Sequence, residues 1–256
     1  MTKLNSTYDD SFYNNQVEGS LRSANKLLAI VYNIFIPESV LDIGCGRGAW
    51  LATCEKLGSI KLTGIDGPWV LVDKLLSKNI VFHEKNFEDD LNVNSKFDLA
   101  ISLEVAEHIS EKYSQQFVST LCNSSELIIF GAATPNQGGD HHINEQPQSY
   151  WISLFNDEGY DCFDIFRGAL WEDTNVEWWY KQNTFLFVKR NSENQKISFD
   201  VLRKLETMPV NITHPQNLQS KCFQINEHEK MMKSPTLKFI IKITYNYIKG
   251  KILFKS

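Results

Sequence analysis

Short apolar runs alternate with segments of helical periodicity along the first two thirds of the chain. The runs SVLDIG, KLTGID, NIVFHE, FDLAISL and SELIIFGA, at 39–44, 61–66, 79–84, 97–103 and 125–132, predict strands. Apolar spacing predicts helices at 21–35, 48–57 and 110–122, with Pro37 and Gly58 ending the first two. Residues 1–20 are polar, and we expect an irregular lid or a short helix there. Strands that alternate with helices predict a mostly parallel sheet covered on both faces.

The pattern changes after residue 135. A polar loop leads into a predicted helix at 147–158, which ends at Gly159. YDCFDIF (160–166) and NTFLFVK (183–189) predict two further strands, expected as an antiparallel pair at the sheet edge. The fold class predicted is therefore α/β: a doubly wound sheet of seven strands, with a helical extension at the C-terminal end.

Two domains are expected, at 1–189 and 190–256. The second begins with a polar linker, RNSENQK, followed by a short predicted helix at 199–206. Its last part, 233–256, holds six lysines and no acid, mixed with apolar residues. We favour a helix packed on the domain with its lysines in solvent. The alternative is a contact of this basic tail with an anionic membrane surface or with another subunit.

Composition limits the function classes. The chain of 256 residues has a formal net charge of -5, which argues against a protein built to bind a nucleic-acid backbone. No apolar run follows the polar N-terminus and none is long enough to span a bilayer, so we expect neither a signal peptide nor a transmembrane helix. The five cysteines form no CxxC pair, and a reducing cytoplasm is the natural expectation.

A glycine-rich turn is the strongest local signal. In VLDIGCGRGAW (40–50), a predicted strand carries Asp42 and then Gly44, Gly46 and Gly48 lead into a helix. Such a turn brings backbone close to a ligand and presents a helix N-terminus to an anionic group. Asp66 ends the next strand, where an acid can accept ribose hydroxyls.

With these residues the chain resembles the class I S-adenosylmethionine-dependent methyltransferases, over roughly residues 8–189. The resemblance rests on GCGRG, Asp66, Asn86-Phe87 and SLEVAEHI (102–109), and it implies a Rossmann-like fold that binds S-adenosylmethionine. The cofactor-binding residues it implies are Asp42, Gly44, Cys45, Gly46, Asp66, Asn86, Phe87, Leu103 and Glu104. A nicotinamide dehydrogenase is disfavoured, because EVAEH at the fourth strand end does not suit hydride transfer.

A reaction site is predicted where the fourth and fifth strands end. Glu104, Glu107 and His108 have spacing i, i+3, i+4, which on a helical turn places them on one face. GGDHHINEQP (138–147) adds His141 and His142. Carboxylates and imidazoles together suit Mn²⁺, Fe²⁺, Co²⁺ or Mg²⁺.

The pattern ExxEH with a later histidine resembles the small-RNA terminal 2′-O-methyltransferases. That resemblance implies a divalent ion held by Glu104, Glu107, His108 and His142. EVxEH also resembles ubiquinone-type O-methyltransferases, in which such residues brace a loop or contact substrate. The catalytic candidates are therefore His141, His142, His108 and Glu107, with a histidine as general base if no metal is bound.

The function expected is methyl transfer to a hydroxyl of a small molecule or sugar. Residues 138–189 resemble a bacterial group of standalone methyltransferases from surface-polysaccharide, lipopolysaccharide or secondary-metabolite pathways. Two alternatives remain: an RNA terminal 2′-O-methyltransferase, which the acidic net charge disfavours, and a non-catalytic cofactor-binding scaffold recruited through the basic tail.

Overall fold

The computed structural model describes residues 10–88, 91–191 and 209–233, with residues 235, 237, 240, 241, 244 and 245, and of residues 10–16 the backbone alone. The strands are β1 (Ser39–Ile43), β2 (Lys61–Asp66), β3 (Ile80–Glu84), β4 (Leu99–Leu103), β5 (Leu127–Gly131), β6 (Tyr160–Phe163) and β7 (Phe185–Lys189). The α-helices are α1 (Asp10–Tyr32), α2 (Ala49–Lys56), α3 (Ser114–Ser124), α4 (Gln148–Asp157), α5 (Arg167–Leu170), α6 (Trp178–Asn183) and α8 (Pro215–Lys233). The 3-10 helices are η1 (Val72–Lys74), η2 (Ala106–His108) and η3 (Glu111–Tyr113).

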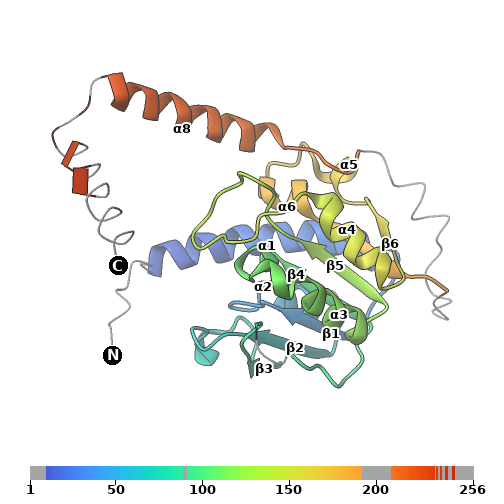
Figure 1. The fold of residues 1–256 in the computed structure, drawn as a ribbon. Helices are drawn as coiled ribbons and strands as arrows, with labels where there is room; N and C mark the ends of the chain where they lie inside the picture. The colour runs from blue at the N-terminus through green and yellow to red at the C-terminus, as the bar shows by residue number, and fades with distance from the viewer. Residues whose placement is uncertain are drawn as a thin grey trace, which may run out of the picture. The chain divides into compact units, whose positions relative to one another are not determined.

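The strands of the described chain form one seven-stranded sheet in the order β3-β2-β1-β4-β5-β7-β6 (Figure 1). Neighbours from β3 to β5 are parallel, and β7 is antiparallel to both β5 and β6. The predicted α/β class, with an antiparallel last pair, is confirmed. The strand order reverses between β1 and β4, and open α/β sheets bind ligands at the carboxyl ends of strands beside such a reversal.

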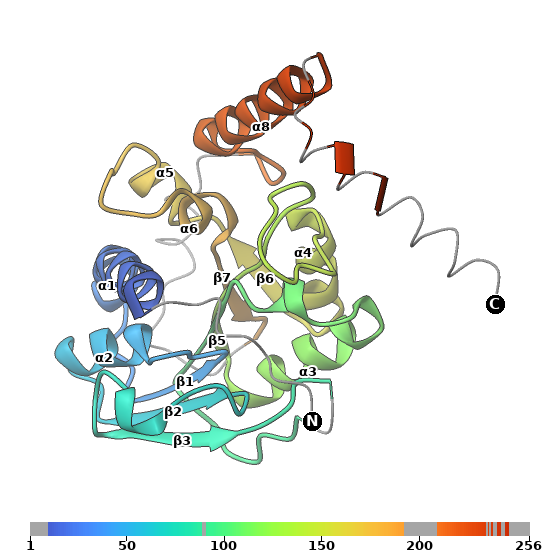
Figure 2. The same cartoon turned by 90° about the vertical axis from the view of Figure 1, so that its left-hand side faces the viewer.

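The sheet is covered on both faces, as continuous apolar strands require. Every residue of β4 and β5 is buried. Figure 2 shows α1, α2 and α6 on one side of the sheet and α3 and α4 on the other. Each side has its own apolar cluster: Leu27, Trp50 and Tyr180 belong to the first, Phe117 and Phe155 to the second.

The bounds of one expected helix differ in the structure, and two short helices were not predicted. The first helix starts at Asp10 instead of 21, so it includes the second half of the segment for which we expected an irregular lid or a short helix. It ends at Tyr32 rather than at 35. The amide of Phe35 still donates to the carbonyl of Val31 (2.8 Å), so the chain leaves the helix through one further turn. The short helices α5 and α6 lie between the two late strands and were not predicted, since four and six residues are too few for a periodic signal.

The chain divides into two compact units, Met1–Ile212 and Thr213–Ser256. The first runs beyond the boundary expected at 189, because the guanidinium of Arg167 donates hydrogen bonds to the carbonyls of Val210 (2.7 Å) and Pro209 (2.6 Å). Residues 192–208, with most of the expected linker and the helix expected at 199–206, lie outside the described residues. In the second unit α8 is described, and of the basic tail only single residues are. No helix among the described residues is long and apolar enough to cross a membrane.

Phe155 offers a test of the packing on the α3–α4 face. Its ring stacks on Phe187 of β7 at 3.9 Å between centroids, and both side chains are fully buried. Phe155→Ala should lower the free energy of unfolding by about 3–5 kcal/mol, measured by urea denaturation. Ile60→Ala, at a side chain that is 69% exposed, is the control and should change stability by less than about 0.5 kcal/mol. Equal effects of the two changes would contradict this packing.

Candidate functional site

The glycine turn between β1 and α2 is held in a conformation that side chains resist. Gly44, Gly46 and Gly48 all have positive φ, at 85°, 51° and 76°. The amides of Gly44 and Cys45 donate to the carbonyl of Ile65 (2.7 and 3.3 Å), which ties the turn to β2. No side chain caps the first turn of α2. Its free N–H groups are therefore available to an anionic ligand group.

The three glycines differ in what surrounds them. A Cβ on Gly44 would lie 2.2 Å from Val105, and one on Gly48 would lie 2.5 Å from Ile80. At Gly46 nothing lies within 4 Å of the same position. The turn thus packs on protein at its two ends and faces open space at its centre, which is where a ligand can approach the backbone.

Two buried acids flank this open space. Asp66 accepts hydrogen bonds from the amides of Gly46 and Gly67, both at 2.7 Å. Burial raises its pKa, while those two hydrogen bonds and one from the Trp69 indole act in the opposite direction. Asp42 is buried and its Oδ2 has no hydrogen-bond partner. Its pKa is raised well above the usual value by burial and then by the nearby Asp66. These oxygens suit donors such as hydroxyl or ammonium groups, both of which S-adenosylmethionine carries.

Asn86 and Phe87, which the resemblance implies as cofactor-binding residues, follow β3. This strand pairs in parallel with β2, so that Glu84 lies beside Asp66. Asn86 is exposed, and its Oδ1 accepts a hydrogen bond from the amide of Glu88 (3.1 Å). Phe87 is half-buried, with its ring 6.0 Å from that of Phe117. The amide oxygen of Asn86 therefore orders its own turn in this structure.

Sequence reasoning missed Trp69 at this edge. The side chain is 68% exposed, and a Cβ on Gly67 would lie 2.2 Å from its ring. The indole thus covers the backbone next to Asp66. A lone tryptophan after a strand carries no signal that would have assigned it to the site.

Glu104 is not on a helical turn with Glu107, so that expectation is wrong. Its φ is 57°, in the left-handed region, and it precedes the 3-10 helix η2. Its carboxylate accepts hydrogen bonds from Asn183 (2.9 Å) and Gln137 (2.8 Å). Burial raises its pKa in spite of those two bonds. Asn183 and Gln137 are buried residues from distant segments, and no sequence pattern indicated them.

Glu107 is the feature that most needs a partner. Its side chain is fully buried and neither carboxyl oxygen has a hydrogen-bond partner. Burial, and then the neighbouring Glu104, raise its pKa well above the usual value, while the backbone amides of Glu107 and Ala133 act in the opposite direction. His142 directs Nε2 toward Glu107, 4.0 Å from its Oε1. A buried polar group without partners costs about 1–3 kcal/mol, so a ligand at this position would relieve a real penalty.

Three of the four predicted metal ligands come together. Potential ligand atoms of Glu107, His108 and His142 lie within 4.8 Å of one another. Two ligands about 2.1 Å from one ion are at most about 4.2 Å apart, so the cluster needs to close only slightly. Burial and His142 lower the pKa of His108, which favours the neutral imidazole that binds metals. Glu104 lies outside this cluster, where the side-chain amides of Asn183 and Gln137 hold its carboxylate.

His141 is placed differently from His142. It is exposed with φ of 61°, and its carbonyl oxygen is 3.3 Å from Nδ1 of His108. A carbonyl only accepts, so this contact leaves Nε2 of His108 as the nitrogen with a lone pair. The backbone of His141, and not its imidazole, takes part in the cluster.

The metal cluster and the glycine turn adjoin. Val105, which packs against Gly44, is two residues from Glu107. The amides of Ile143 and Asn144 both donate to the carbonyl of Glu107, at 2.9 and 3.0 Å, so the loop after β5 is fastened to η2. A cofactor bound in the turn would therefore lie next to whatever binds at Glu107.

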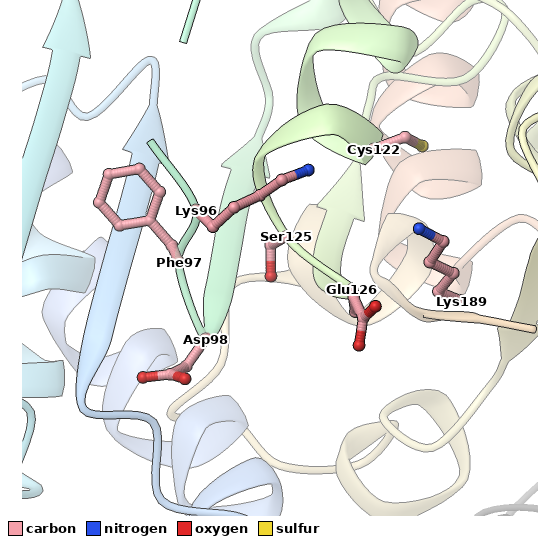
Figure 3. Close-up of a pocket in the computed structure, with 7 residues that line it drawn as sticks. All are labelled: Lys96, Phe97, Asp98, Cys122, Ser125, Glu126 and Lys189. Atoms are coloured by element: carbon pink, nitrogen blue, oxygen red, sulfur yellow. The ribbon is translucent and has the colours of Figure 1, made fainter. Parts of the chain in front are cut away.

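A separate surface hollow lies at the end of the sheet where β4 and β5 begin, opposite to the end where they lead into the candidate site (Figure 3). Its lining residues precede β4 and β5 or lie at the ends of α3 and β7: Lys96, Phe97, Asp98, Cys122, Ser125, Glu126 and Lys189. A five-residue strand is about 13 Å long, which separates the hollow from Glu107. It therefore forms no part of the candidate site.

Residues 13–126 match the family model of a methyltransferase domain. Magnesium protoporphyrin IX methyltransferase from Synechocystis PCC 6803 with bound SAM is a similar solved structure (TM-score 0.53, 15% identity, covering 72% of this chain and 86% of that one). So is DesVI from Streptomyces venezuelae (TM-score 0.52, 13% identity, 70% and 96%). The chain has the Rossmann-like methyltransferase fold.

The methyltransferase domain of bacterial CtHen1-C is also among the similar solved structures, at a TM-score of 0.49 and 19% identity, covering 66% of this chain and 98% of that one. No curated protein matches the chain. At these identities the similarity concerns the fold, and the chemistry has to be argued from the site.

The glycine turn yields a prediction about stability. Gly44→Ala adds a clash with Val105 to the cost of positive φ, and should lower the free energy of unfolding by about 2–5 kcal/mol. Gly46→Ala meets no atom and should cost only about 1–2 kcal/mol. Urea denaturation of both variants checks the difference. Equal losses would mean that the turn is not packed against Val105.

Proposed function

We propose that this chain transfers the methyl group of S-adenosylmethionine to a hydroxyl of a small molecule or sugar, with a divalent metal ion at Glu107, His108 and His142. The observation that carries the proposal is the fully buried, unpartnered carboxyl of Glu107 beside two imidazoles, next to the glycine turn. The acceptor that we propose belongs to surface-polysaccharide or secondary-metabolite biosynthesis, on the resemblance of residues 138–189 stated above.

The binding of S-adenosylmethionine is supported by the polar groups in and around the glycine turn. The methionine carboxylate suits the free N–H groups at the start of α2, and the ribose hydroxyls suit Asp66. The unpartnered Oδ2 of Asp42 suits a donor beneath the turn. Gly46 leaves the space that backbone contact with a ligand requires.

The residues of the metal cluster would orient the acceptor. A divalent ion supplies a Lewis acid that binds an acceptor hydroxyl and lowers its pKa. Glu107 contributes the negative charge, and the two imidazoles contribute neutral ligands. The acceptor oxygen then forms a bond to the methyl carbon as the bond to sulfur breaks, which leaves S-adenosylhomocysteine and releases the hydroxyl proton. Alignment of oxygen, methyl carbon and sulfur supplies much of the rate.

The same cluster supports a second candidate, terminal 2′-O-methylation of RNA, because it contains three of the four residues of the small-RNA pattern. Binding of a single-stranded oligoribonucleotide whose affinity falls steeply with salt would favour RNA over a small acceptor. Unmeasurable RNA binding at low salt would contradict it. We favour the small acceptor because the net charge of the chain is -5.

Cofactor binding can be tested at Asp66. Asp66→Ala removes a hydrogen-bond acceptor for the ribose hydroxyls and for two backbone amides. The affinity for S-adenosylhomocysteine should fall at least about tenfold, because one charge-assisted hydrogen bond contributes about that much. Calorimetric titration gives the affinity. Asp73→Ala, at an exposed acid of the following η1, should leave it unchanged. Unaltered binding in the Asp66 variant would place the cofactor elsewhere.

The metal proposal predicts opposite changes in stability and binding. Glu107→Leu removes a buried unpartnered carboxyl, so metal-free protein should gain about 1–3 kcal/mol of unfolding free energy. The same variant should lose the binding of Mn²⁺, expected at about one ion per chain in wild-type protein saturated with S-adenosylhomocysteine.

Chelator-stripped protein is titrated with Mn²⁺ by calorimetry for this test, and stability is followed by urea denaturation. His83→Ala removes an exposed imidazole of β3 and serves as the control. A wild-type protein without binding heat, with the cofactor product bound, would rule out the metal site. It would leave a histidine as the base.

A further inference from the structure

Glu145 contacts His142 from the side opposite to Glu107. Its Oε1 is 3.0 Å from Nδ1 of His142. The same oxygen accepts a hydrogen bond from the amide of Gly138 at 2.6 Å. The carboxyl group is thus anchored by its own loop and faces one nitrogen of the imidazole.

The hydrogen bond decides which nitrogen of His142 carries the proton. A carboxylate only accepts, so Nδ1 must be the donor. A neutral imidazole then has its lone pair on Nε2, the atom that faces Oε1 of Glu107 at 4.0 Å. Because the two ring nitrogens point in different directions, Glu145 faces the side of the ring away from the ion that His142 would bind. Its hydrogen bond therefore acts on that ion through the ring, and its charge also acts on Glu107.

The backbone at Gly139 lies against the face of the His142 imidazole and restricts its position. A Cβ on Gly139 would lie 2.2 Å from Nε2 of His142 and 2.5 Å from Cε1. The imidazole therefore packs directly on this glycine. Asn144 in the same loop is buried, and its side-chain amide donates to the hydroxyl of Ser114 (3.0 Å). Its backbone amide donates to the carbonyl of Glu107, so the loop is fixed against η2.

We propose that Glu145 is the positioning residue of the site: it fixes the tautomer of His142 and directs Nε2 at Glu107, with Gly139 setting the plane of the ring. The inference rests on the proposed metal function, but the tautomer is a property of the metal-free protein. The i, i+3 spacing of His142 and Glu145 is the signal by which the sequence could have indicated the pair. Partners of this kind typically change metal affinity about 10–100-fold when they are removed.

The test combines a spectrum and an affinity. In metal-free wild-type protein, ¹⁵N NMR of the histidines should show His142 protonated at Nδ1, and Glu145→Ala should lose that signature. Mn²⁺ affinity should fall about 10–100-fold in Glu145→Ala and less in Glu145→Gln, which keeps an acceptor oxygen. Gly139→Ala, which displaces the ring but keeps the Glu145 carboxylate, should also weaken the binding of Mn²⁺.

Two comparisons separate positioning from a general loss of structure. In a His142→Ala background, Glu145→Ala should cause no further loss of Mn²⁺ affinity. Glu177→Ala, at a half-buried glutamate that bonds Arg22, should change neither the spectrum nor the affinity. An unchanged tautomer and affinity in Glu145→Ala would overturn the inference. Wild-type protein that shows the Nδ1–H tautomer but binds no Mn²⁺ would support the role of Glu145 and refute the metal site.

Discussion

A carboxyl group buried without a hydrogen-bond partner costs free energy, which a ligand or a neighbouring cation can recover. Glu107 is such a group, and the local structure is organised around it. The 3-10 helix η2 delivers the side chain into the interior, and two amides of the loop after β5 hold its backbone carbonyl. His108 and His142 supply the facing nitrogens. A fold selected for stability alone would have little use for this arrangement.

The two halves of the site depend on the reversal of strand order between β1 and β4. β1 ends in the glycine turn and β4 ends in the segment that carries Glu104 and Glu107, so the neighbouring strands bring the two together. Val105 fills the space against Gly44, which makes the turn and the metal cluster one packed unit. Cofactor and acceptor would thus be aligned by the sheet itself rather than by a mobile loop.

Local signals were enough to predict the strands, the glycine turn and the approach of the segments 104–108 and 138–147, because each depends on apolar periodicity or on the carboxyl ends of parallel strands. The choice of Glu107, His108 and His142 as ligands came from the resemblance to the small-RNA methyltransferases. The positive φ of Glu104 could not be predicted, since it is stabilised by Asn183 and Gln137 from distant segments. A helical turn was assumed at that residue, and the assumption overestimated the ligand set. The start of α1 in a polar segment likewise carries no periodic signal.

Anomalous diffraction from crystals of the protein with S-adenosylhomocysteine and Mn²⁺ tests the central claim most directly. The account predicts one anomalous peak bonded to a Glu107 oxygen and to Nε2 of His108 and His142, with the cofactor bound at Gly46 and its sulfur facing the metal. A cofactor bound in the turn with no peak at Glu107, or a peak bonded to other residues, would contradict it.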